Sequence, residues 1–148
     1  MRFLALLAVL LAGCATPPPA PQQTPEQPPV APATPPRQEN IAIAGLMDSA
    51  RAEAAAGNLA GAAASLERAL RIEPRNPRLW HELARVRLKQ GQFAQAESVA
   101  ARSSSWAGED RALRAENWRL IAETRRARGD IEGAQAALEQ AGASREHK

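Results

Sequence analysis

Cysteine and histidine, the side chains most readily used for nucleophilic and acid–base chemistry near neutral pH, are few in this chain of 148 residues. There is one cysteine, Cys14, and there are two histidines, His81 and His147. His81 adjoins Glu82, but consecutive residues of a helix point to different faces, and the sequence places no nucleophile near them. The serines at 103–105 are expected where a helix ends, and no metal-ligand spacing or glycine-rich phosphate loop is present. The sequence therefore predicts a protein that is not an enzyme and holds no metal or cofactor, and it leaves the chemistry of Cys14 to be explained.

Cys14 lies between an apolar run at residues 3–12 and a proline-rich stretch. A single thiol can neither close an intramolecular disulfide nor supply paired zinc ligands. The apolar run follows Arg2 and has the length of a signal-peptide core, well short of the roughly 20 apolar residues that a spanning helix needs. Its end, LAGC, resembles the lipobox of bacterial lipoproteins, in which the thiol is acylated and the chain is cut just before the cysteine. The resemblance implies a signal peptide over residues 1–13 and a lipid anchor at Cys14; an ordinary signal peptide with an incidental cysteine is the alternative.

The residue after the cysteine bears on the destination of such a protein. In bacterial lipoproteins an aspartate there favours retention in the inner membrane, and this chain has Ala15 instead. The resemblance therefore implies transfer to the outer membrane, with the polypeptide facing the periplasm. Several acyl chains, palmitate among them, would make the attachment permanent, because each buried methylene contributes about 0.8 kcal/mol.

Residues 14–39 are expected to form a disordered linker. Ten of the twelve prolines of the chain lie between residues 15 and 38, and such a segment lacks the backbone donors and the apolar surface of a folded core. In an extended polyproline conformation, at about 3.1 Å per residue, it would reach roughly 70 Å. Proline-rich runs also serve as ligands for aromatic grooves, but a tether is the interpretation that we favour.

The remaining part, residues 40–142, is rich in alanine, leucine, arginine and glutamate, which favours helices. Gly57, Gly91 and Gly129 each follow one amphipathic run and precede another, at separations of 34 and 38 residues. A period of 34 residues with a helix–turn–helix in each unit is typical of tetratricopeptide repeats. Asn76 and Pro77 are suited to the start of a helix, as its N-cap and its first residue.

Apolar residues recur on one face of each expected helix, at helical spacing. In the first unit they are Leu46, Ala50, Ala62, Leu66, Ala69 and Leu70. In the second they are Trp80, Leu83, Ala84, Phe93, Ala96, Val99 and Ala100, and in the third Trp118, Ile121, Ala122, Ala134 and Leu138. These residues are the predicted core.

The segments "NPRLWHELARVRLKQGQFAQAE" and "NLAGAAASLERALRIEPRNP" resemble tetratricopeptide repeats. The aromatic, small, turn-glycine, alanine and closing-proline positions of the family map onto Trp80, Ala84, Gly91, Ala96 and Pro74. The resemblance implies an all-α fold, a short α-solenoid of about three repeats at residues 43–76, 77–110 and 115–141. Only a tail at 143–148 follows, too short for a capping helix, so a second copy is a candidate to dock on the uncapped last repeat.

In this family the first helices of successive repeats line a concave groove. The resemblance maps the groove positions onto Arg51, Arg78, His81, Arg85, Lys89, Arg119, Glu123 and Arg126. The groove is therefore expected to be net positive, with Glu123 as the main exception. The alternative is that these charges form an ordinary solvated helix face, because they match no specific binding motif.

The net charge of +3 and the pI of about 10.0 do not make this a nucleic-acid-binding protein, because an exported, anchored chain has no access to DNA. The expected function is a noncatalytic scaffold of the outer membrane that binds another envelope protein or peptide, with acidic segments favoured by the basic groove. Lipoproteins of this kind assist pilus secretins, outer-membrane protein assembly or peptidoglycan enzymes. The alternative is a structural lipoprotein associated with peptidoglycan or another polysaccharide.

Overall fold

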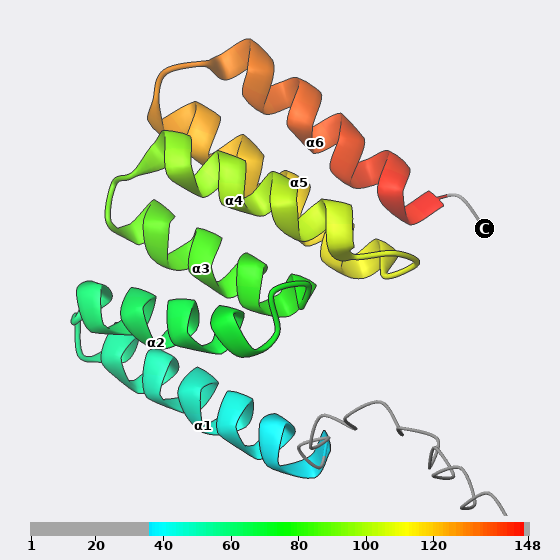
Figure 1. The fold of residues 1–148 in the computed structure, drawn as a ribbon. Coiled ribbons are helices and arrows are strands. Elements are labelled where there is room, and N and C mark those ends of the chain that lie inside the picture. Colours follow the sequence, from blue (N-terminus) through cyan, green and yellow to red (C-terminus); the bar gives the residue numbers. More distant parts are fainter. Residues whose placement is uncertain (1–35, 147–148) are drawn as a thin grey trace, which may run out of the picture. The chain divides into compact units, whose positions relative to one another are not determined.

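The computed structural model describes residues 36–146, and this part of the chain consists of α-helices without any strand (Figure 1). The six helices are α1 (Pro36–Ala55), α2 (Leu59–Ile72), α3 (Pro77–Lys89), α4 (Phe93–Trp106), α5 (Arg111–Ala127) and α6 (Ile131–Glu146). The predicted all-α fold is confirmed. The signal peptide, Cys14 and most of the proline-rich linker that the sequence predicts lie outside the described residues.

The helices pack as three consecutive pairs, α1 with α2, α3 with α4 and α5 with α6. Contacts between α2 and α3 and between α4 and α5 join each pair to the next, so that the pairs stack in chain order (Figure 1). Each pair is one helix–turn–helix repeat, and the number of repeats agrees with the spacing of the turn glycines. Within the described residues no helix is both long and apolar enough to cross a membrane.

The turn inside each repeat depends on a glycine in the left-handed region. Gly57, Gly91 and Gly129 have φ angles of 78°, 73° and 83°. L side chains rarely adopt this conformation, which ends the first helix and turns the chain toward the second. In the first and third repeats the next residue then caps the new helix: Asn58 accepts a hydrogen bond from Gly61 N (3.0 Å) and Asp130 from Gly133 N (2.9 Å).

The boundaries of three helices differ from those expected. α1 begins at Pro36, before the predicted domain start at residue 40, and α6 continues to Glu146, into the predicted tail at 143–148. The serines at 103–105 lie in the last turn of α4, which ends at Trp106, as expected for residues at a helix end. The third repeat begins with α5 at Arg111, before the predicted repeat boundary at residue 115, because the Asp110 carboxylate accepts a hydrogen bond from Leu113 N (3.0 Å) and so caps the helix at that point.

Two clusters of buried side chains form the core. The first joins α1, α2 and α3, and its largest fully buried members are Leu66 and Leu79. The second joins α3, α4, α5 and α6, and many of its members are alanines, which let helix axes approach closely. Trp80, a predicted core residue, is only partly buried against the first cluster, and Leu79 beside it is fully enclosed.

The predicted face of α6 is wrong by one residue. Ala134, Ala137 and Ala141 form its buried seam, whereas Leu138 is 43% exposed. Residues 134, 137 and 141 recur at i, i+3 and i+7, so the seam follows the helical period through the small side chains. Alanines at these positions bring α6 close to α5 and leave Leu138 on the outer side of the last repeat.

Candidate functional site

The first helices of the repeats, α1, α3 and α5, line two hollows, one on each side of α3. The first hollow, of about 250 Å³, has an apolar floor made by Met47, Ala50, Ala54, Leu66 and Val86. The second, of about 590 Å³, lies between α3 and α5, and its apolar lining is Leu88, Phe93, Leu120 and Ala127. Arg85 and Lys89 of α3 line both hollows. We call the two hollows together the repeat groove.

Most of the predicted groove residues lie in the repeat groove. Those that line it are Arg51, His81, Arg85, Lys89, Arg119 and Glu123. Arg78 and Arg126 do not line either hollow. Arg78 instead pairs with Asp110, at 3.0 Å between Nη2 and Oδ2, so it contacts the cap of α5.

The charge of the groove is more balanced than the sequence suggested. Glu82 and Glu116 line the hollows besides Glu123, and neither was among the predicted residues. Arg85 pairs with Glu82 at 3.3 Å, one turn away on α3. Exposed pairs of this kind contribute little stability, about 0–1 kcal/mol, but they offset the charge locally.

Two of the groove cations have no acidic partner in the described part of the chain. Lys89 and Arg119 form no ion pair and no side-chain hydrogen bond there, and Arg126 beyond the groove forms none either. Lys89 lies at the junction of the two hollows. These cations are the groups best placed to meet a carboxylate, and the apolar floors beside them can accept side chains.

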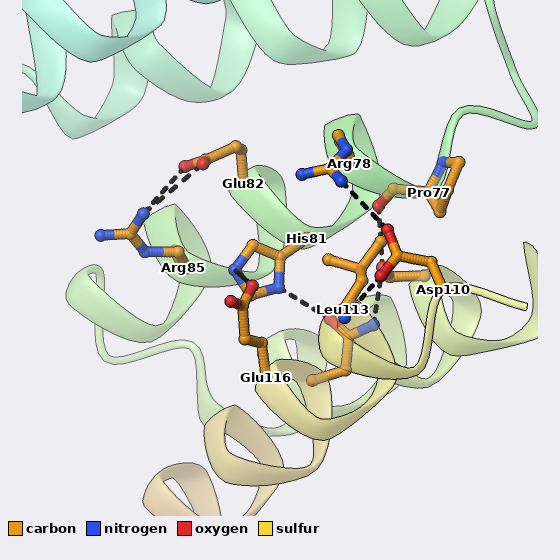
Figure 2. A network of polar contacts seen from close by, with 10 residues as sticks. Pro77, Arg78, His81, Glu82, Arg85, Asp110, Leu113 and Glu116 are labelled. Carbon is orange, nitrogen blue, oxygen red and sulfur yellow. Dashed lines mark hydrogen bonds and ion pairs between the residues drawn. The ribbon is translucent and has the colours of Figure 1, made fainter. Parts of the chain in front are cut away.

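A buried chain of hydrogen bonds lies beneath the groove (Figure 2). Ser103 of α4 and Asn117 of α5 are fully buried. Ser103 Oγ is 2.7 Å from the Pro77 carbonyl oxygen and 2.8 Å from Asn117 Nδ2, and Asn117 Oδ1 is 2.8 Å from His81 Nδ1. The chain ties α3, α4 and α5 together, and it holds the His81 ring at the edge of the second hollow.

The direction of these hydrogen bonds places one ring proton of His81. The Pro77 carbonyl can only accept, so Ser103 donates its one proton there and must accept from Asn117 Nδ2. Asn117 Oδ1 then accepts from His81, so the ring carries its proton on Nδ1. His81 Nε2 lies 4.0 Å from Glu116 Oε2. A neutral His81 presents Nε2 as an acceptor, and a charged one pairs with Glu116.

Two serines of α4 already donate their hydroxyl protons within the fold. Ser103 Oγ is enclosed and already donates to Pro77, and Ser105 Oγ donates to the Arg102 carbonyl oxygen at 2.7 Å. Among the residues that the structure describes, no group of three or more potential ligands could hold a metal ion. The arrangement offers charge pairing, hydrogen bonding and apolar contact, which are the means of binding a polypeptide.

Comparison with known families gives a match to the tetratricopeptide repeat over residues 53–116. No curated protein matches the chain. Among solved structures, the globular C-terminal domain of P. aeruginosa LpoP is similar, with 46% sequence identity and a TM-score of 0.67. The similarity covers 68% of this chain and 94% of that domain. The chain therefore belongs to the tetratricopeptide-repeat family, which confirms the resemblance found in the sequence. The family and this neighbour together support a lipoprotein scaffold that binds proteins.

Proposed function

We propose that this protein is a noncatalytic, lipid-anchored scaffold of the outer membrane, facing the periplasm, whose repeat groove binds a segment of another envelope protein. The observation that carries the proposal is the form of the groove: two hollows with apolar floors meet at Lys89, and Lys89 and Arg119 have no acidic partner in the described residues. Such a surface suits a segment that bears both carboxylates and apolar side chains.

The class of partner is narrowed by two observations. The similarity to the LpoP domain makes an enzyme of peptidoglycan synthesis the first candidate among the three classes of envelope partner that the lipoprotein resemblance implies. The apolar floors of the two hollows suit the apolar side chains of a polypeptide, which a glycan strand does not carry. A protein segment is therefore favoured over direct attachment to the polysaccharide.

The groove is tested by reversing its charge. In the triple variant Arg85→Glu, Lys89→Glu, Arg119→Glu we expect loss of capture of the partner in a crosslinked envelope pulldown, because like charges would then meet. The purified periplasmic domains of the peptidoglycan synthases are the first partners to assay. A variant with the same charge change elsewhere, Arg68→Glu, Arg111→Glu, Arg114→Glu, is the matched control.

Both variants should keep the helical circular dichroism of the parent, because the substituted side chains lie outside the two core clusters. Equal capture by the groove variant and the control would refute the groove as the binding site. Sedimentation of the parent with purified sacculi in the absence of protein would instead support the polysaccharide alternative.

Lipid anchoring is tested at Cys14. We expect Cys14→Ser to block processing and to remove the protein from the outer-membrane fraction, because serine cannot carry the thioether-linked lipid. Fractionation with immunoblotting follows both effects. A Cys14→Ser protein of mature size in the outer membrane would contradict the lipoprotein assignment.

A further inference from the structure

Two arginine–tryptophan stacks lie where the α2–α3 loop meets the second half of α4. The Arg102 guanidinium carbon is 4.9 Å from the centroid of the Trp80 ring, and that of Arg75 is 5.1 Å from the centroid of the Trp106 ring. Trp80 Nε1 donates to the Pro74 carbonyl oxygen at 2.8 Å, which fixes the ring. Arg102 and Trp106 are one turn apart on the same face of α4, so the two stacks are neighbours. We call this surface the tryptophan edge.

The stacks hold the two guanidinium groups in place without using their hydrogen-bond donors. Neither Arg75 nor Arg102 forms an ion pair or donates a side-chain hydrogen bond within residues 36–146. A guanidinium that lies over an indole is restrained in its rotamers, and its N–H edge remains available for a carboxylate. An arginine restrained in this way loses less conformational freedom on binding than a mobile one.

Apolar surface accompanies these two cations. Trp106 is 43% exposed and Ile72 is 40% exposed, although both are large hydrophobic residues. Ile72, Pro74 and Arg75 line a shallow hollow of about 610 Å³ at the loop. Tryptophan and arginine are the residues most enriched where protein interfaces concentrate their binding energy.

We propose that the tryptophan edge is a second protein-binding surface, and that it takes an acidic segment in which an apolar side chain lies between carboxylates. The charge pattern argues for this occupant, because Arg75 and Arg102, which have no ion-pair partner among residues 36–146, flank exposed apolar surface. Arg78, which follows Arg75 by three residues, shows the contrast, since Asp110 already neutralises it. The tryptophan edge shares no lining residue with the repeat groove, so it does not depend on the groove as a binding site.

The test uses the mature chain from residue 14, with Cys14→Ser so that no lipid is attached, labelled with ¹⁵N. The probes are the blocked peptides Glu-Leu-Glu and Gln-Leu-Gln, which differ only in charge. We expect the acidic peptide to cause saturable shifts in the indole N–H signals of Trp80 and Trp106. Trp118, which packs against the second core cluster, provides the internal control and should not shift.

Substitution then distinguishes the arginines of the tryptophan edge from other exposed arginines. Arg75→Gln with Arg102→Gln should weaken the binding of Glu-Leu-Glu about tenfold, because two exposed charge pairs are lost. Arg68→Gln, at an exposed arginine of α2 outside the edge, should leave it unchanged. In the double variant Arg75→Glu, Arg102→Glu, the peptide Lys-Leu-Lys should bind in place of the acidic one. Circular dichroism melts confirm that the variants are folded.

Several outcomes would overturn the proposal. One is the absence of a saturable shift, and another is an equal shift with both peptides. A third is binding of phosphatidylethanolamine–phosphatidylglycerol vesicles that requires Arg75 and Arg102 while the peptide has no effect, which would make the edge a membrane contact. The groove charge-reversal variant should retain the shifts of Trp80 and Trp106, so failure of the groove and failure of the edge are distinguishable.

Discussion

Two adjacent serines of α4 should respond in opposite ways to the same substitution. Ser103 is fully buried, and its hydroxyl donates to the Pro77 carbonyl and accepts from Asn117 Nδ2, at 2.7 and 2.8 Å. Ser104 Oγ is also enclosed, but it has no hydrogen-bond partner among the described atoms. Replacing each by alanine removes one hydroxyl from the same stretch of helix, so the difference between the two variants isolates the hydrogen bonds.

The magnitudes follow from the contacts. Ser103→Ala leaves Asn117 Nδ2 buried without an acceptor, which costs about 1–3 kcal/mol. The gain in helix propensity, about 0.5 kcal/mol, offsets part of this. Ser104→Ala has the same gain in propensity and also removes a desolvated, unpaired hydroxyl, so it should stabilise by about 0.5–1 kcal/mol. The two free energies of unfolding should therefore differ by about 2 kcal/mol.

Urea unfolding followed by circular dichroism measures this difference directly, and thermal melts should separate the two midpoints by about 8 °C or more. A double-mutant cycle between Ser103→Ala and Asn117→Ala should show a coupling of about 1 kcal/mol, because the residues share one hydrogen bond. Equal stabilities of the two serine variants would refute the role given to the buried network. A destabilised Ser104→Ala would show that this hydroxyl has a partner after all.

Two further pairs of variants test the fold. Leu79→Ala should lower the free energy of unfolding by about 2–5 kcal/mol, because Leu79 is fully buried. Leu138→Ala, at a half-exposed position, should lower it by under about 1 kcal/mol. Urea unfolding distinguishes the two variants, and equal effects would contradict the register of α6. Gly91→Ala should destabilise the protein by about 1–2 kcal/mol, because Gly91 has a φ angle of 73°. Gly45→Ala inside α1, where an added Cβ meets nothing within 4 Å, should stabilise it by about 0.5–1 kcal/mol. Thermal melts measure both effects, and a neutral Gly91→Ala would count against the left-handed turn.

The repeats could be predicted from the sequence because their turns depend on local chemistry. A glycine followed by a polar capping residue favours the end of one helix and the start of the next through local contacts alone. Gly57 and Gly129 lie in such turns, as expected. The seam of α6 could not be predicted from hydrophobicity. In an alanine-rich helix the closest approach is set by side-chain size, so Ala137 is buried while the more apolar Leu138 is not.

The ion pair that removes Arg78 from the predicted groove could not be foreseen from the sequence, for a different reason. Arg78 and Asp110 are far apart in the chain, and their contact depends on how the second repeat stacks on the third. The buried network did leave a trace in the pattern. Ser103 follows Ala96 and Ala100 on one helical stripe, and Asn117 lies between Leu113 and Leu120 on another, so each is a polar residue in a buried row. Such a residue predicts a hydrogen-bonded partner in the core, although it does not name the partner.

The buried network gives the repeat groove and the tryptophan edge a common support. His81 lines the groove while its neighbour Trp80 belongs to the edge, and Ser103 lies in the core while its neighbour Arg102 stacks on Trp80. Consecutive helical residues point to different faces, so α3 contributes His81 to the groove and Trp80 to the edge. The hydrogen bonds through Asn117 fix α3 against α4 and α5 beneath both surfaces. A change of groove shape that moved α3 against α4 would have to break these buried hydrogen bonds. A buried donor or acceptor that is left without a partner raises the free energy of the folded state. The two surfaces are therefore expected to be rigid and to bind independently, which suits a scaffold that holds two segments at a fixed separation.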